Sequence, residues 1–317
     1  MPVGRARRTN RALLVVTLAL LQSPGSLAAD RESPDDRWWH LLVPKAFQAN
    51  PRLELTAITE FTEAGRQRPD VSPATPALYE AHALGFRNQG DAIQTTPLSR
   101  ADIETVLVRS LARNGFIRAT EFQQPELAII YLWGAHNRYD PEVSPVSTDV
   151  LVRSVLDRAA LVGGTKFAAE LARAYRRTEL LAAASPKRLE TLSGELQGAP
   201  VGIALGMMQM NGLMNPVRLF AMRDAKTQRL LDQAADDCYF VVASVYDYSS
   251  VARNEPQLLW RTRLTVSARG VSQEQSLPHL IASGAPYFGR EMEEAVTMKT
   301  RPVRPGDVEI GTAIVIP

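Results

Sequence analysis

Two strand-like segments joined by a short polar connection constrain the fold of this chain more than any other feature. The first, Tyr239–Tyr248, is rich in valine and aromatic residues, and the second, Leu258–Val266, alternates in polarity. Residues 251–256 lie between them and contain Asn254 and Pro256, which are typical of a turn. The pattern predicts an antiparallel hairpin, and therefore a sheet that needs further strands and a covering layer.

The region before this hairpin supplies both strands and a helix. Leu78–Phe86 is typical of a strand, and the continuous apolar run Leu127–Trp133 predicts a strand covered on both faces. Between them, Ser99 and Asp102 have the spacing of a helix-capping pair, and apolar residues follow at intervals of three and four. We therefore expect a helix over residues 100–114.

The C-terminal region completes the expected fold. A helical pattern covers residues 276–292 with a break at Pro286, and apolar residues alternate over residues 308–316 as in a strand. We predict an α+β fold with a mixed or mainly antiparallel sheet of about four or five strands packed on two helices.

The chain is expected to divide into a core, an insertion and an arm. Residues 77–139 and 238–317 form the α+β core domain in this interpretation. Residues 140–237 have helical patterns and form an insertion between the second and third core strands. Residues 29–76 form an N-terminal arm that ends in a Pro-rich linker.

Residues 1–28 have the order of a secretory signal peptide. Four arginines precede an apolar stretch from Ala12 to Leu21, and Pro24, Gly25 and small residues follow it. The stretch is shorter than the roughly 20 apolar residues that a spanning helix needs. We expect cleavage after Ala28, by the general secretory or the twin-arginine route. The mature protein is then periplasmic or extracellular, without a transmembrane helix, and peripheral membrane association stays open.

Composition and charge narrow the function classes. The chain has 45% hydrophobic residues, enough for a core, and its single cysteine excludes an intrachain disulfide. Loss of residues 1–28 would change 36 basic and 34 acidic residues to 32 and 34. A near-neutral chain without a dense cationic patch argues against nucleic acid as a partner.

One segment has an unusual composition. Leu196–Val217 has no charged side chain, has glycines at four-residue intervals, and contains four methionines, Met207, Met208, Met210 and Met214. The spacing favours a buried element with close backbone packing. The alternative is a surface element that contacts a partner or a membrane.

Familiar catalytic and cofactor motifs are missing from the sequence, so we expect neither an enzyme nor a cofactor. The four histidines are far apart and lack the spacing of metal ligands. Cys238 opens an apolar strand, where a buried inert thiol is usual. An exported hydrolase would need a concave site that gathers acidic and histidine side chains, chosen from Asp140, His136, Asp236, Asp237 and His279.

Several strand residues are candidates for a partner-binding groove. Arg261 and Arg263, with Trp133, His136 and Tyr246, could line a groove for an anionic or glycan partner. The alternative places Trp133 in the core and the two arginines on a solvated strand face.

Residues 107–134 and 238–268 resemble a family of small bacterial cell-envelope proteins, the uncharacterised domain of unknown function 4136. The shared features are a helix ending in Gly115-Phe116, a Pro125-Glu126-Leu127 entry into a strand, and a second hairpin strand that opens with residues 258–261. The resemblance extends over about residues 78–137 and 238–292 and implies an envelope protein, without implying catalytic residues. Members are often lipoproteins, whereas this chain has no cysteine near the cleavage site.

The sequence thus predicts an exported, non-enzymatic envelope protein that binds a protein, lipid or glycan. The alternatives are an exported hydrolase with an unfamiliar site and a carrier of a small apolar ligand, whose pocket the methionines would line.

Overall fold

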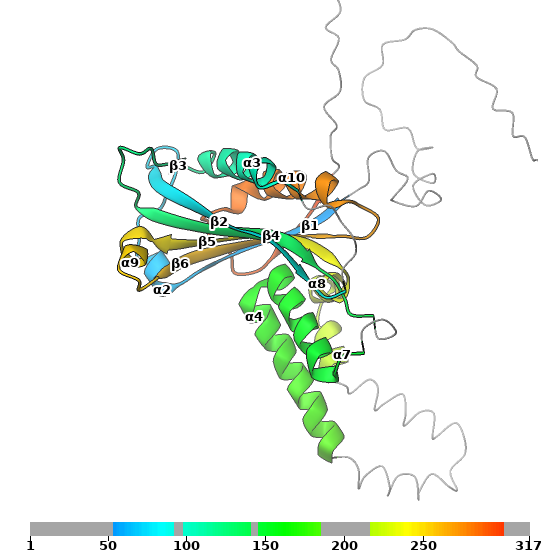
Figure 1. Cartoon of the computed structure of the whole chain (residues 1–317). Coiled ribbons are helices and arrows are strands. Elements are labelled where there is room, and N and C mark those ends of the chain that lie inside the picture. Colours follow the sequence, from blue (N-terminus) through cyan, green and yellow to red (C-terminus); the bar gives the residue numbers. More distant parts are fainter. Residues whose placement is uncertain (1–52, 92–97, 141–144, 185–215, 301–317) are drawn as a thin grey trace, which may run out of the picture. The chain divides into compact units, whose positions relative to one another are not determined.

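A computed structural model describes residues 53–91, 98–140, 145–184 and 216–300 (Figure 1). Its sheet has seven strands: β1 (Leu53–Phe61), β2 (Ala77–Gln89), β3 (Phe116–Arg118), β4 (Leu127–His136), β5 (Cys238–Asp247), β6 (Leu258–Ser267) and β7 (Val296–Thr300). The helices are α2 (Glu63–Arg66), α3 (Arg100–Ala112), α4 (Thr148–Ala184), α7 (Pro216–Ala221), α8 (Ala225–Ala235), α9 (Tyr248–Ala252) and α10 (Gln273–Gly284), followed by the 3₁₀ turn Ala285–Tyr287.

The sheet is mixed, and its strand order is β3-β2-β4-β5-β6-β1-β7. β2 runs parallel to both β3 and β4, and all the other neighbours are antiparallel. The α+β class and the β5–β6 hairpin are confirmed, with the short helix α9 in the connection. The expected four or five strands are too few.

The missed strands are short or pair with distant parts of the chain. Leu53–Phe61 was expected in the arm, but it forms β1 between β6 and β7. β3 spans only Phe116–Arg118 and β7 only Val296–Thr300, which is too short for a clear alternation. The strand expected at residues 308–316 lies outside the described residues, as do the expected signal peptide and the start of the arm.

One face of the sheet carries α3 and α10, and the main apolar core lies between these two helices and the strands (Figure 1). Leu107 and Leu111 of α3 and Leu277 and Ile281 of α10 are buried there against strand residues. As the sequence indicated, Ser99 caps α3: its side chain accepts a hydrogen bond from the Asp102 amide at 3.2 Å.

The other face carries the helices that follow β4, namely α4, α7 and α8 (Figure 1). α4 lies mainly against β1 and β6, and α8 packs on α4. A break divides α4 at Gly164, whose φ of 84° favours glycine. This helical layer is offset toward β1 and β6. In the part of the chain that the structure describes, no helix combines the length and apolar character needed to cross a bilayer.

Candidate binding surface

Arg263 of β6 is a buried structural residue. Its guanidinium forms an ion pair with Glu60 of β1, and the two side chains are 7% and 23% exposed. Glu60 also accepts a hydrogen bond from the Thr165 amide at 2.8 Å, where α4 restarts after its break. Burial alone would raise the pKa of Glu60, but the hydrogen bonds from Thr165 and the charge of Arg263 hold it below its ordinary value. Arg263 therefore joins the sheet to α4 and is not available to a partner.

Trp133 lies on the opposite face, inside the main core. It is 2% exposed and stacks on Tyr131 with a centroid separation of 6.1 Å. This placement agrees with the core alternative and removes Trp133 from the proposed groove.

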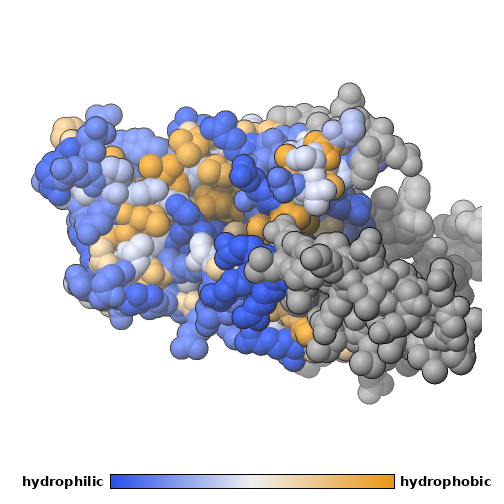
Figure 2. Space-filling view, turned by 90° about the horizontal axis from the view of Figure 1, so that it is seen from below, coloured by the Kyte–Doolittle hydropathy of each residue, from blue (hydrophilic) through white to orange (hydrophobic). Residues whose placement is uncertain are grey.

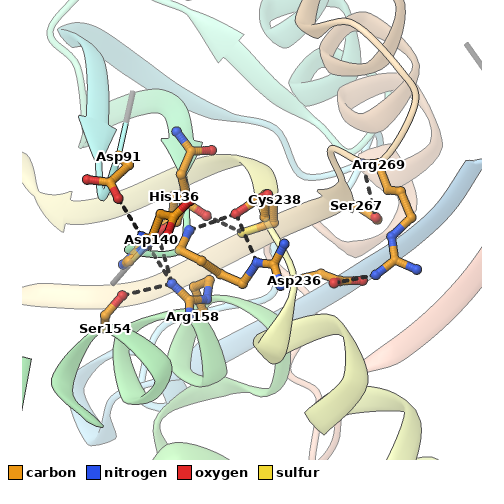
Figure 3. A network of polar contacts seen from close by, with 12 residues as sticks. Asp91, His136, Asp140, Ser154, Arg158, Asp236, Cys238, Ser267 and Arg269 are labelled. Carbon is orange, nitrogen blue, oxygen red and sulfur yellow. Dashed lines mark hydrogen bonds and ion pairs between the residues drawn. The ribbon is translucent and has the colours of Figure 1, made fainter. Parts of the chain in front are cut away.

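His136 belongs to a buried polar network at the end of β4 (Figure 3). Arg158 of α4, 3% exposed, donates to Ser154 Oγ at 2.8 Å, to Asn137 O at 3.0 Å and to Ala234 O at 2.7 Å, and its Nη1 lies 3.4 Å from His136 Nδ1. Burial, together with the charge of Arg158, lowers the pKa of His136 to about 4. The imidazole is therefore neutral near pH 7, and the network anchors α4 and α8 to the sheet.

Cys238 lies beside this network and has the environment of an inert thiol. Its Sγ is 3.8 Å from His136 O, and the side chain is 2% exposed. Burial raises the pKa of the thiol to about 12. A thiolate nucleophile is therefore disfavoured at neutral pH.

The acidic residues considered for a hydrolase lie near the same end of the sheet (Figure 3). Asp236 forms an ion pair with Arg269 at 2.6 Å, and Asp237 accepts from the Arg138 amide at 2.7 Å. Asp140 also lies there, but His279 is on α10, across the sheet. No group of three or more His, Cys, Asp or Glu side chains within the described ranges has an arrangement that could hold a metal ion.

The cavities of the described structure include a wide depression of about 560 Å³ on α3, beside Glu104, Arg109 and Arg118, and two cavities that are small for a ligand pocket. One of these two, of about 250 Å³, has Phe61, Phe116 and Trp260 in its wall. The other, of about 210 Å³, lies between α4 and α8, where Arg223 pairs with Glu170 at 2.9 Å. Ligand pockets are usually about 300–1,000 Å³. None of the hydrolase candidates lines any of these three cavities, and Met207, Met208, Met210 and Met214 lie outside the described residues.

Tyr246 and Arg261, by contrast, lie together on the face that carries α4. Ile130, Ser244 and Arg261 are directly opposite one another across β4, β5 and β6. Tyr246 and Leu132 are each two residues further along their antiparallel strands, so they share this face and lie on opposite sides of the Ile130–Ser244–Arg261 row. We call these five residues, Ile130, Leu132, Ser244, Tyr246 and Arg261, the open sheet face.

The open sheet face is only partly covered. Ile130, Leu132, Tyr246 and Arg261 are all partly exposed, and neither Ile130 nor Leu132 belongs to the apolar clusters of the described core. Figure 2, which views the molecule from the α4 side, shows apolar residues bordered by hydrophilic ones. The apolar run of β4 predicted a strand covered on both faces. It missed this surface because α4 lies over β1 and β6, and a sequence pattern does not show where a helix packs on a sheet.

Arg261 gives the open sheet face a positive charge. Its Nε donates to Ser244 Oγ at 2.8 Å, and it forms no ion pair with the residues that the structure describes. A guanidinium on the same sheet face as a tyrosine and two aliphatic side chains is suited to a carboxylate that is itself flanked by apolar groups. The comparisons with known proteins add no assignment, since no family model matches the chain and a search of curated proteins finds no similar sequence.

Proposed function

We propose that this chain is an exported, non-enzymatic protein of the cell envelope that binds a polypeptide partner through the open sheet face. The observation that carries the proposal is the difference between two arginines of β6. Arg263 is buried and forms an ion pair with Glu60, whereas Arg261 is partly exposed and has no carboxylate partner among the described residues. Ile130, Leu132 and Tyr246 provide apolar contact area around that charge. Tyrosine and arginine are enriched among the residues that contribute most to protein interfaces.

The chemistry of the surface favours a polypeptide over a lipid or a glycan. Attraction to anionic headgroups requires a cluster of cations, and the open sheet face has a single arginine. Glycan sites commonly use several exposed aromatic faces, whereas the open sheet face has one tyrosine, Tyr246, and Trp133 and Trp260 are 2% and 4% exposed. A partner segment with an acidic residue between apolar residues matches both the charge and the apolar area.

The proposal of export rests on the N-terminal pattern. Four arginines, an apolar stretch and small residues in residues 1–28 support secretion. The lone cysteine is buried and needs no reducing environment, so the fold is compatible with an oxidising compartment.

A binding role is better supported than the hydrolase alternative. His136 has its Nδ1 near the Arg158 guanidinium, and its Nε2 is buried without a partner among the described residues. A general base must reach a substrate proton directly or through one water molecule. A buried imidazole at this position does not meet that requirement.

Site-specific photo-crosslinking in the cells that naturally express the protein tests the proposal. Leu132 is replaced by a photoreactive phenylalanine analogue, and the adducts are identified by mass spectrometry. We expect one predominant polypeptide adduct whose yield falls at least about tenfold when Arg261→Glu is added. Arg109→Glu, on the exposed surface of α3, is the matched control and should leave the yield unchanged.

Two results would contradict the proposal. One is an adduct yield that is equal in the Arg261→Glu and Arg109→Glu backgrounds. The other is crosslinking to lipid or glycan without a polypeptide adduct.

A further inference from the structure

β2 has an outer edge that is only partly paired. β3 covers it at Ala77, Leu78 and Tyr79, whereas β2 continues to Gln89. Beyond Tyr79, β4 is the only strand of the described structure that pairs with β2. Residues 80–89 thus present an open strand edge, the kind of surface on which another strand can add.

The hydrogen bonds at both ends of β2 show which main-chain groups face outward. Leu78 O accepts from the Glu126 amide at 2.9 Å on the β4 side, and Tyr79 O accepts from the Ala119 amide at 2.8 Å on the outer side. At the other end, Gln89 O accepts from the Asn137 amide at 2.8 Å, again on the β4 side. The direction of the main-chain N–H and C=O groups alternates along a strand. These groups therefore point away from β4 at Ala81 and Ala83 and, after the irregularity at Ala83–Gly85, at Phe86 and Asn88.

Opposite charges lie near the two ends of this edge and on the same sheet face. Glu80 pairs in register with Ala128 of β4, and Arg87 pairs with Gly134. Since Ala128 and Gly134 are six residues apart on β4, an even number, Glu80 and Arg87 lie on the same sheet face. Arg87 is exposed and forms no ion pair with any described residue, while Glu80 lies 3.3 Å from the exposed His82 ring and interacts with the Tyr248 hydroxyl. Between them, Leu84 is 50% exposed, although it is a large apolar residue.

We propose that the open edge of β2 pairs antiparallel with the same edge of a second copy of this chain, so that the two sheets become continuous across a two-fold axis. In the register that places Glu80 opposite Arg87 of the second copy, Ala81 lies opposite Phe86, and both have outward-facing main-chain groups. The two-fold axis repeats the Glu80–Arg87 pair on its other side and brings the two Leu84 residues near each other. The pairing ends where β3 already occupies the edge at Tyr79.

The irregularity in β2 favours a second copy over an arbitrary strand. Gly85 has a φ of +82°, and β2 shifts its register between Ala83 and Gly85. Bulges and charges on an edge normally prevent indiscriminate strand addition. A strand with the same bend at the same distance from the axis, and with the charges in reverse order, is compatible with both features.

Sedimentation equilibrium of the full mature chain tests this pairing. We expect a monomer–dimer equilibrium whose dissociation constant rises at least about tenfold for Arg87→Glu and for Glu80→Arg, because each change places two like-charged pairs across the axis. The double variant Glu80→Arg/Arg87→Glu should restore dimerisation, since it reverses both charges. Arg109→Glu is the control for a charge change away from the edge.

A wild-type chain that stays monomeric at millimolar concentration would overturn the inference. So would a dimer that is unaffected by the single variants or not restored by the double one. These results are independent of the proposed function, which depends on Arg261 and is read from crosslinking yield.

Discussion

Arg261 and Arg263 lie two residues apart on the same face of β6, yet among the described residues only Arg263 has a carboxylate partner. Glu60 of the neighbouring strand forms the ion pair with Arg263, whereas the Nε of Arg261 donates to the Ser244 hydroxyl at 2.8 Å. The difference follows from the position of α4, which covers β6 near Arg263 and orders Glu60 through Thr165. Arg263 therefore stabilises the fold, and Arg261 is the arginine that we propose contacts a partner.

Substitution of Arg263 should destabilise the protein far more than the same substitution of Arg261. Arg263→Met leaves the Glu60 carboxylate beneath α4 without its cation, and we expect a loss of about 2–4 kcal/mol, because Glu60 keeps some exposure and its contact with Thr165. Arg261→Met should change the free energy of unfolding by less than about 1 kcal/mol. Urea unfolding of the two variants measures the difference, and equal losses would contradict the assignment.

His136 should make stability depend on pH between about 4 and 6.5. Its pKa falls from 6.5 in the unfolded chain to about 4 in the fold, because of burial and of Arg158, so the unfolded chain binds more protons in this window. The free energy of unfolding should therefore decrease as the pH falls from 6.5 to 4, with a contribution of about 3 kcal/mol from this residue.

Comparing variants isolates this contribution from that of other groups. Unfolding of the His136→Gln variant should lack that part of the pH dependence, whereas His82→Gln, at an exposed position, should keep it. A wild-type profile identical to that of His136→Gln would show that the imidazole is not buried beside Arg158.

Cys238 should be unreactive in the folded protein. Its thiol is buried with a pKa of about 12, so both the thiolate fraction and access are low at pH 8. Labelling with a disulfide reagent such as dithionitrobenzoate should follow the rate of unfolding and become complete in concentrated denaturant. Fast, stoichiometric labelling under native conditions would contradict the inert environment and would reopen a nucleophilic role.

The sequence predicts those parts of the fold whose signals are local. The β5–β6 hairpin follows from alternation and a nearby turn, and α3 follows from the Ser99 cap and helical spacing. β1 escaped prediction because its partner β6 lies about two hundred residues away, as the Thr56–Thr265 separation of 209 positions shows, and because its residues precede a Pro-rich segment. Alternation alone shows neither which strand it joins nor that it belongs to the sheet.

The candidate site was predictable only in part, for the same reason. The pattern placed Arg261 and Arg263 on one face, but they are equivalent in sequence, and the carboxylate that distinguishes them is 203 positions away. Tyr246 and Arg261 were identified from residue type. Ile130 and Leu132 were not, because an apolar run gives no information about how far a helical layer extends over a strand.

Charge reversal at Arg261 tests the central claim most directly. In cells that produce the Leu132 photo-crosslinking variant, the yield of the polypeptide adduct is measured with Arg261→Lys, Arg261→Glu and Arg109→Glu. The account predicts a largely retained yield with lysine, a loss of at least about tenfold with glutamate, and no change for Arg109→Glu. A yield that does not respond to the charge at position 261 would contradict a partner-binding role for the open sheet face.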